Sequence, residues 1–305
     1  MLDLAIVIVN YNVCDLLRNC LKSVCASTGI QFDICVVDNA SPDDSAGMVA
    51  REFPQVHLIR NPKNCGYAAA NNLGLRWFGF DNQQSASSIQ QSEIPRYALL
   101  LNPDTVVPPD AFASLIKLMD EHPEFGVTGP KLIRLDGSLD LACRRGFPSV
   151  GVSLWRLTRL SKIFPRSPRF GRYNMTYLDP DQPAEIDSVV GAFMLVRGAA
   201  IEQVGLLDET FWMYGEDLDW AYRLKQAGWR VYYYPRVVVQ HIKRASSGQA
   251  NAAARAKYEF DRAMWLFYRK HYQAGTARWL DALVRFGVGL KGGPRLRAEI
   301  RGQKQ

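Results

Sequence analysis

The sequence predicts an α/β fold with a mostly parallel central sheet. Short apolar runs rich in β-branched residues, such as Ala5–Val9, are continuous rather than alternating, which is typical of strands buried on both faces. Stretches whose apolar residues recur at helical spacing separate these runs. The 305 residues, 48% of them hydrophobic, are enough to bury a sizeable core and exclude a mostly disordered chain.

Strands and helices are expected to alternate through the first 130 residues. Continuous apolar runs predict strands at 5–9, 32–37, 57–59 and 97–101. Amphipathic spacing predicts helices at 15–25, 45–53, 71–78 and 109–121. Strand–helix–strand units of this kind give parallel strands, and ligands bind at the carboxyl ends of such strands. We therefore expect the functional residues where the strands end.

The pattern is less regular further along the chain. Polar residues at 81–95 predict an exposed insertion, and residues 143–180, rich in Arg, Pro and aromatics, predict either a mobile loop over a site or an irregular surface segment. The remaining expected elements are a strand at 188–196, a helix at 215–227, two strands at 231–234 and 237–240 broken by Pro235, and basic helical structure from 252 onward.

The net charge of +7 is concentrated in the last quarter of the chain. Residues 1–241 carry 23 Lys/Arg and 26 Asp/Glu, net −3, whereas residues 242–305 carry 14 and 4, net +10. Apolar and aromatic residues at helical spacing within 258–270 and 278–291 predict basic amphipathic helices that meet an anionic membrane surface. The alternative is a terminal helix packed on the rest of the protein. No nucleic-acid motif accompanies the basic residues, so nucleic acid is not an expected partner.

Export and membrane-spanning signals are not expected in this chain. No run approaches the roughly 18 apolar residues of a spanning helix, and the acidic Asp3 precedes the first apolar run where a signal peptide has basic residues. The six cysteines lack metal-site spacing and are expected to be reduced thiols. We expect a cytoplasmic protein, peripheral on the inner face of the membrane.

Polar residues follow the second and third predicted strands. A carboxylate at Asp38 could accept a hydrogen bond from the ring N–H of a pyrimidine, or could simply cap a turn. Gly66 precedes a run of small residues that opens a helix. This helix start suits a phosphate-bearing ligand, and it also suits close helix–sheet packing.

Three further groups of polar residues carry candidate chemistry. Asn102-Pro103-Asp104 ends a buried strand and could share a divalent cation, or form an ordinary β-turn. His241 ends a later strand as a structural residue or a metal ligand, with nitrogen favouring Mn²⁺ over Mg²⁺. Glu216, Asp217 and Asp219 start a helix among aromatics. Acids there complement the helix dipole, and a dry setting also raises basicity.

Taken in order, these segments resemble the inverting family 2 glycosyltransferases of the GT-A (Rossmann-like) fold. The resemblance is carried by segments whose letters are IVIVNYN from Ile6, VDNAS from Val37, NCGYAAAN from Asn64, LNPD from Leu101, VGAFM from Val190 and GEDLD from Gly215. Asn102 stands where the family's Asp-x-Asp metal motif has its first Asp, and this form resembles the rhamnosyltransferase branch. An amide binds metal less strongly than a carboxylate does.

The resemblance implies a nucleotide-diphospho-sugar donor, usually dTDP-L-rhamnose in that branch, and a glycan or lipid-linked acceptor in cell-envelope polysaccharide synthesis. It implies Asp217, beside Glu216, as the catalytic base and a Mg²⁺ or Mn²⁺ ion held by Asp104 and His241. The implied donor-binding residues are Asn10, Tyr11, Asp38, Asn64, Gly66, Asn71, Asn102 and Asp104. The implied acceptor-side residues are Gly191, Trp212, Asp219 and Trp220.

The resemblance also implies a domain organisation. Residues 1–245 form the catalytic domain, with the nucleotide-sugar half at about 1–130 and the acceptor half at about 131–245. Residues 246–305 form the basic amphipathic helical extension. A non-catalytic nucleotide-sugar or glycan-binding protein on the same fold is the alternative, since fold alone does not give function.

Overall fold

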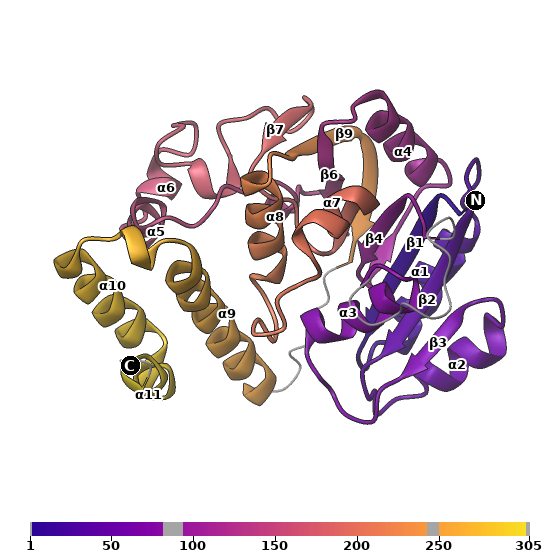
Figure 1. Cartoon of the computed structure of the whole chain (residues 1–305), viewed down its shortest axis with the longest axis horizontal. Coiled ribbons are helices and arrows are strands. Elements are labelled where there is room, and N and C mark those ends of the chain that lie inside the picture. The colour runs from indigo at the N-terminus through magenta and orange to yellow at the C-terminus, as the bar shows by residue number, and fades with distance from the viewer. Residues whose placement is uncertain (1, 82–93, 243–249, 303–305) are drawn as a thin grey trace.

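The computed structural model describes residues 2–81, 94–242 and 250–302 and shows an α/β molecule built on one mixed sheet (Figure 1). Most of the predicted polar insertion at 81–95 lies outside the described residues. Within these residues the sheet has nine strands, in the order β3-β2-β1-β4-β8-β6-β9-β5, with β7 paired to β9. β3, β2, β1, β4, β6 and β9 run in one direction, so the sheet is mostly parallel, as predicted.

The N-terminal half of the sheet consists of four parallel strands linked by helices. The strands are β1 (Leu4–Asn10), β2 (Phe32–Asp38), β3 (His57–Arg60) and β4 (Tyr97–Leu101). The helices are α1 (Cys14–Cys25), α2 (Ser45–Glu52) and α3 (Tyr67–Trp77). β1 and β4 are buried along their whole length because neighbours cover both faces. β1 and β2 end together, with Asn10 directly opposite Asp38.

The second half of the sheet is mixed. Its strands are β5 (Thr105–Val106), β6 (Phe125–Ile133), β7 (Ala184–Ile186), β8 (Phe193–Arg197) and β9 (Arg230–His241). Its helices are α4 (Ala111–Glu121), α7 (Gly198–Val204) and α8 (Glu216–Gln226). β8 lies antiparallel between β4 and β6 and so joins the two halves into one sheet.

Two expectations for this half are wrong. β9 is one strand rather than two. Its pairing with β6 shifts register between Tyr234 and Val238, so the segment around Pro235 bulges from the ladder, where proline's missing N–H costs nothing. β6 was not predicted, because Gly126, Gly129 and Pro130 interrupt its strand-forming residues. Its position between two strands holds it in the sheet despite that composition.

Helices also form where the sequence showed weak periodicity. Residues 143–180 contain α5 (Val150–Leu157) and α6 (Leu160–Ile163). The C-terminal region folds as α9 (Ala250–His271), α10 (Arg278–Lys291) and α11 (Gly293–Gly302). Single 3₁₀ turns lie at Leu141–Cys143, Arg172–Asn174 and Gln273–Gly275. No described helix is both long and apolar enough to cross a bilayer.

α9 is not an exposed membrane-facing helix. Ala263, Leu266 and Phe267 form a buried cluster with Phe211 and with Leu218 of α8. A second buried cluster joins α9 to α11 through its aromatic residues. The apolar stretch within 258–270, predicted to meet a membrane, is therefore mostly core. This half of the C-terminal prediction is wrong, and the alternative of a helix packed on the rest of the protein holds for α9.

Candidate active site

The carboxyl ends of β1 and β2 hold Asp38 in a fixed position. Asn10 Nδ2 donates to Asp38 Oδ1 at 3.0 Å, and the Ser41 backbone N–H donates to Asp38 Oδ2 at 3.1 Å. Asn10 is fully buried, so it acts by positioning Asp38 and Ser41 rather than by touching a ligand. Tyr11, the next residue, is half exposed. Each Asp38 oxygen retains a lone pair that could accept a further donor.

The segment after β3 is organised by Asn39, a residue that the sequence analysis missed. Asn39 Nδ2 donates to Asn64 Oδ1 and to the Gly66 carbonyl, and Asn39 Oδ1 accepts from the Cys65 N–H. Asn64 Oδ1 also accepts from the Gly66 N–H at 3.0 Å. Asn64 therefore shapes the loop, with its side-chain oxygen taken up by protein donors.

Gly66 is required by a protein contact. Its φ of +89° is one that side chains rarely adopt, and an added Cβ would lie 2.4 Å from the Trp212 carbonyl oxygen. That carbonyl accepts the Tyr67 N–H at 2.7 Å, which ties the start of α3 to the loop before α8. Arg255 of α9 lies 4.0 Å over the Trp212 ring. Close backbone approach at Gly66 thus serves Trp212, not a phosphate.

Tyr67, also missed, connects the two halves of the site. Its hydroxyl lies 3.0 Å from Asn102 Oδ1 and 2.9 Å from the Gly191 carbonyl oxygen. The Asn102 N–H donates to Ala192 O at 3.0 Å. The end of β4 is thereby fixed against the segment before β8, and Asn102 faces its protein neighbours while Asp104 continues the turn.

Asp104 and His241 lie side by side, as the metal prediction requires. The antiparallel pair β5–β9 places Thr105 opposite His241, and His241 Nε2 lies 3.3 Å from Asp104 Oδ1. On the other edge of the ring, Nδ1 lies 2.9 Å from Asp140 Oδ2. Burial lowers the pKa of His241, but the hydrogen bonds to Asp104 and Asp140 outweigh it and raise the pKa to about 9.

The donor set at this pair fits a divalent cation. An oxygen from Asp104 and a nitrogen from His241 suit Mn²⁺ better than Mg²⁺. Metal-binding histidines usually donate their other ring N–H to a carboxylate, and Asp140 is that carboxylate here. Among the described residues, no group of three His, Cys, Asp or Glu side chains could hold a metal ion unaided. A cation here would need further ligands from a bound diphosphate and water.

Asp217 is a buried carboxylate held by a buried cation. Its Oδ2 accepts from Arg145 Nη2 at 2.6 Å and from the Gly191 N–H at 2.9 Å, and its Oδ1 accepts from the Leu218 N–H at 2.7 Å. Arg145 also donates to the Val189 carbonyl. The ion pair fixes the orientation of the Asp217 side chain. Sequence analysis missed Arg145, because it is one of several Arg residues in an irregular segment.

Glu216 has the opposite environment to Asp217. It is buried, and its Oε2 has no hydrogen-bond partner among the described residues. Burial, and then the charge of Asp217, raise the pKa of Glu216 to about 8. At neutral pH the Glu216 carboxyl group is therefore largely neutral, beside the Asp217 side chain that pairs with Arg145. Environments that separate two adjacent carboxyls in this way are typical of acid–base sites.

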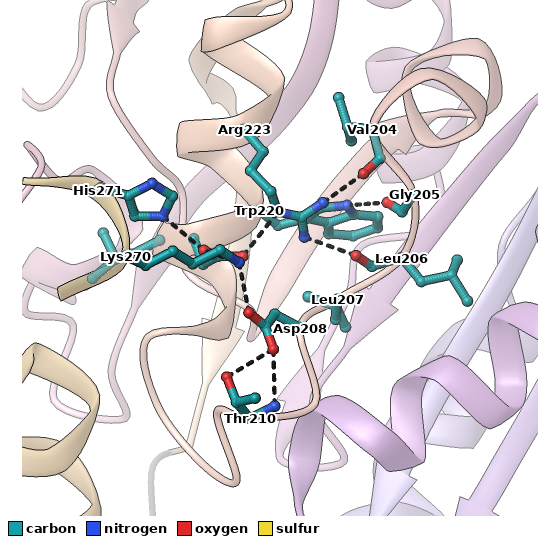
Figure 2. Close-up of polar contacts among 12 residues, drawn as sticks. Val204, Gly205, Leu206, Leu207, Asp208, Thr210, Trp220, Arg223, Lys270 and His271 are labelled. Carbon is teal, nitrogen blue, oxygen red and sulfur yellow. Dashed lines mark hydrogen bonds and ion pairs between the residues drawn. The ribbon is translucent and has the colours of Figure 1, made fainter. Parts of the chain in front are cut away.

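Asp219 is a structural residue, which corrects its assignment to the acceptor side. It is fully buried, and it contacts the side chains of Arg223, Lys270 and His271, which Figure 2 labels. Its Oδ1 lies 2.7 Å from His271 Nε2 and 2.8 Å from Lys270 Nζ, and its Oδ2 accepts from Arg223 Nε at 2.9 Å. Burial raises the pKa of Asp219, but these contacts, led by the His271 hydrogen bond, bring it to about 2.

Trp220 and Asn71 are also core residues. The Trp220 ring is fully buried, and its Nε1 donates to the Gly205 carbonyl at 2.9 Å, so it cannot touch an acceptor (Figure 2). Asn71 is fully buried in α3 and donates to the Tyr67 carbonyl, so it cannot touch a donor. The neighbouring Asn72 clamps the loop before α8 by exchanging hydrogen bonds with the Leu207 backbone.

Comparisons with known proteins match this arrangement to one family. The family model described as Glycosyl transferase family 2 matches residues 5–139. The N-acetylglucosaminyl-diphospho-decaprenol L-rhamnosyltransferase of Mycobacterium tuberculosis is 26% identical over 298 residues, which cover 98% of this chain and 94% of the relative. The protein carries a family 2 glycosyltransferase domain at residues 5–139 and is a transferase enzyme.

One further relative and one solved structure are similar to this chain. Rhamnosyltransferase WbbL of Escherichia coli K12 is 30% identical to this glycosyltransferase over 169 residues, covering 53% of this chain and 59% of WbbL. The solved structure of GalNAc-T7 with UDP, GalNAc and Mn²⁺ has a TM-score of 0.59 at 18% identity and covers 92% of this chain and 53% of that one. At that identity the likeness shows the fold alone, which is the predicted GT-A fold.

Proposed function

We propose that this glycosyltransferase transfers L-rhamnose from dTDP-L-rhamnose to a hydroxyl of a lipid-linked acceptor in cell-envelope glycan synthesis, with inversion at the anomeric carbon. The names of the Mycobacterium tuberculosis and Escherichia coli relatives support the sugar, and that of the former supports a lipid-linked acceptor. Asn102-Pro103-Asp104 supports the same branch. The alternative of a non-catalytic binding protein is set aside, because nearly the whole chain aligns with an enzyme.

The observation that carries the proposal is the hydrogen-bonded link from the end of β4, through Tyr67 and Gly191, to Asp217. Asn102 and Asp104 end β4, and Gly191 hydrogen-bonds Asp217 through its N–H. The Tyr67 hydroxyl lies within hydrogen-bonding distance of both Asn102 and the Gly191 carbonyl. The candidate cation site next to Asn102 and the fixed Asp217 carboxyl group are thereby linked by hydrogen bonds, which supports a displacement between two bound reactants.

In the proposed reaction Asp38 accepts the N3–H of thymine, and Asp217 accepts the proton of the acceptor hydroxyl. The acceptor oxygen bonds to the anomeric carbon while the bond from that carbon to the diphosphate oxygen breaks on the opposite face. Nucleotide diphosphate leaves, and one displacement inverts the configuration. A divalent cation at Asp104 and His241 would offset charge on the diphosphate. Arg145 keeps Asp217 oriented before the transfer.

A donor screen tests this proposal. The protein is incubated with dTDP-, UDP- and GDP-sugars in the presence of Mg²⁺ or Mn²⁺, and release of nucleotide diphosphate is followed. We expect release from dTDP-L-rhamnose above all others. Preference for a UDP- or GDP-sugar would overturn the donor assignment, and release from none of the donors, with a polyprenyl-linked glycan present as acceptor, would overturn the proposed activity.

A further inference from the structure

α10 presents an apolar stripe to its outer side. Trp279, Leu283, Phe286 and Leu290 recur at three- and four-residue intervals, which puts them on one face of the helix, and each is between 58% and 70% exposed. The opposite face of α10 packs inward, with Val284 and Val288 against the buried cluster around Trp265. An ordinary surface helix has the reverse arrangement, with its polar face outward.

A second exposed apolar group lies on the neighbouring helices α5 and α6. Leu154, Leu157, Ile163 and Phe164 are between 46% and 73% exposed. Val150, at the start of α5, packs on the same buried cluster as Val284 and Val288, so α5 adjoins α10. The three helices lie at the same end of the molecule, away from the N-terminal strands (Figure 1).

The charges around these groups are almost all positive. Residues 150–170 contain five Lys/Arg and no Asp/Glu, and residues 278–291 contain three Lys/Arg and one Asp. That single acid, Asp281, pairs with Arg285. Exposed apolar side chains among cationic ones match an anionic lipid surface. Nucleic acid would match the charge but would leave the apolar side chains in water.

A groove beside the α10 stripe combines the same two properties. It has a volume of about 340 Å³ between α10 and α11. Its lining mixes apolar side chains and guanidinium groups from the two helices, namely Phe286, Leu290, Ile300, Arg285, Arg297 and Arg301. Arg285 Nη1 is buried without a hydrogen-bond partner among the described residues. Such a groove suits a phosphate group attached to an acyl chain.

We propose that α5, α6 and α10 form a docking face for an anionic membrane leaflet. α9 anchors this face on the catalytic domain rather than entering the membrane itself. The inference deepens the proposed function and rests on its lipid-linked acceptor, which the docking face would bring within reach of Asp217. The binding is reversible and weakens with salt, because its electrostatic part is screened.

Vesicle sedimentation tests the docking face. Wild type, Leu157→Glu, Phe286→Glu and the double variant are mixed with phosphatidylcholine vesicles with or without phosphatidylglycerol, at low and high salt. Leu135→Glu is the matched control, since Leu135 is 60% exposed but lies outside the face. We expect wild type and control to sediment with anionic vesicles at low salt only. The bound fraction of the double variant should fall about tenfold or more, because each change adds an acid to an apolar contact. Circular dichroism verifies that each variant is folded.

Several results would overturn the docking face. The first is a wild type that does not sediment with anionic vesicles at low salt. The second is a double variant that binds vesicles as well as the control does. The third is salt-sensitive binding of the wild type to DNA but not to vesicles. Donor affinity is measured by calorimetry without vesicles in parallel. Intact dTDP-L-rhamnose binding with no vesicle binding removes the docking face and leaves the proposed donor standing. The reverse result removes the donor and leaves the docking face.

Discussion

Gly66 shows how a single residue joins two halves of the site. Its backbone lies at φ +89° and ψ 174° against the Trp212 carbonyl. Gly66→Ala should lower the free energy of unfolding by about 2–4 kcal/mol, from backbone strain and from the clash together. Gly205→Ala is the matched control, because Gly205 has φ +77° and ψ −176° with open space around it.

Chemical denaturation of the two glycine variants separates the clash from the strain. Gly205→Ala should show the strain alone, and Gly66→Ala should lose clearly more stability. Equal losses would mean that the contact between Gly66 and Trp212 does not constrain the fold.

Asp104 and His241 make a prediction about metal dependence. Asp104→Ala should abolish most of the gain in donor affinity that Mn²⁺ gives, because the variant removes the carboxylate ligand. Asp140→Ala removes the carboxylate that orients His241. This variant should bind Mn²⁺ about 10–100-fold more weakly than wild type does. Calorimetric titration of donor with and without Mn²⁺ measures both. A metal effect unchanged in Asp104→Ala would place the cation elsewhere.

Sequence reasoning at the residue scale predicts polar residues at strand ends. Asp38 and His241 end β2 and β9, and Asp104 lies 3.3 Å from His241. Asp219 could not be assigned in the same way. It lies two residues after Asp217, about 200° around α8, and so faces α9 instead of the acceptor side. Arg145 was missed because its partner lies far along the chain.

At the scale of elements, the Asp219 contacts attach α9 to α8. The pKa of Asp219 is about 2 in the folded protein, below its ordinary value of 3.8. A lowered pKa means that the charged form stabilises the fold above pH 3.8, and that this stabilisation is lost as the pH falls toward 2. The difference is worth roughly 2 kcal/mol. Acid should therefore weaken the attachment of α9 to α8, because it protonates Asp219.

The comparison of wild type with Asp219→Asn tests this attachment. The variant should be less stable than wild type at neutral pH, because it removes the buried anion that pairs with Arg223 and Lys270. The gap between the two proteins should narrow as the pH falls through this range, as followed by urea denaturation at each pH. A gap that stays constant with pH would contradict the role given to the Asp219 charge.

The helices α9 and α10 show where local sequence patterns mislead. The aromatic stretch in α9 and the stripe on α10 have similar composition, yet one is buried and the other exposed. The difference comes from Phe211 and Leu218, which offer α9 an apolar surface. Sequence periodicity predicts a helix with an apolar face but not the partner of that face.

For the whole molecule, the predicted boundary near residue 245 does not separate two independent units. α9 shares buried clusters and ion pairs with the segment from Asp208 to α8. The α/β core and the parallel strands of its first half follow from the alternation of apolar runs. The antiparallel insertion of β8 between β4 and β6 depends on pairings between distant segments, which no local pattern contains.

The most direct test of the account is the turnover of Asp217→Asn, measured with its donor affinity and beside Glu216→Gln. The amide keeps the size of the side chain but cannot accept the proton. Turnover should fall by about 10²–10⁴ while donor affinity stays nearly intact. Glu216→Gln should lose far less, because Glu216 is already largely neutral at pH 7. If folded Asp217→Asn keeps more than half of wild-type turnover, Asp217 is not the base and the account is contradicted.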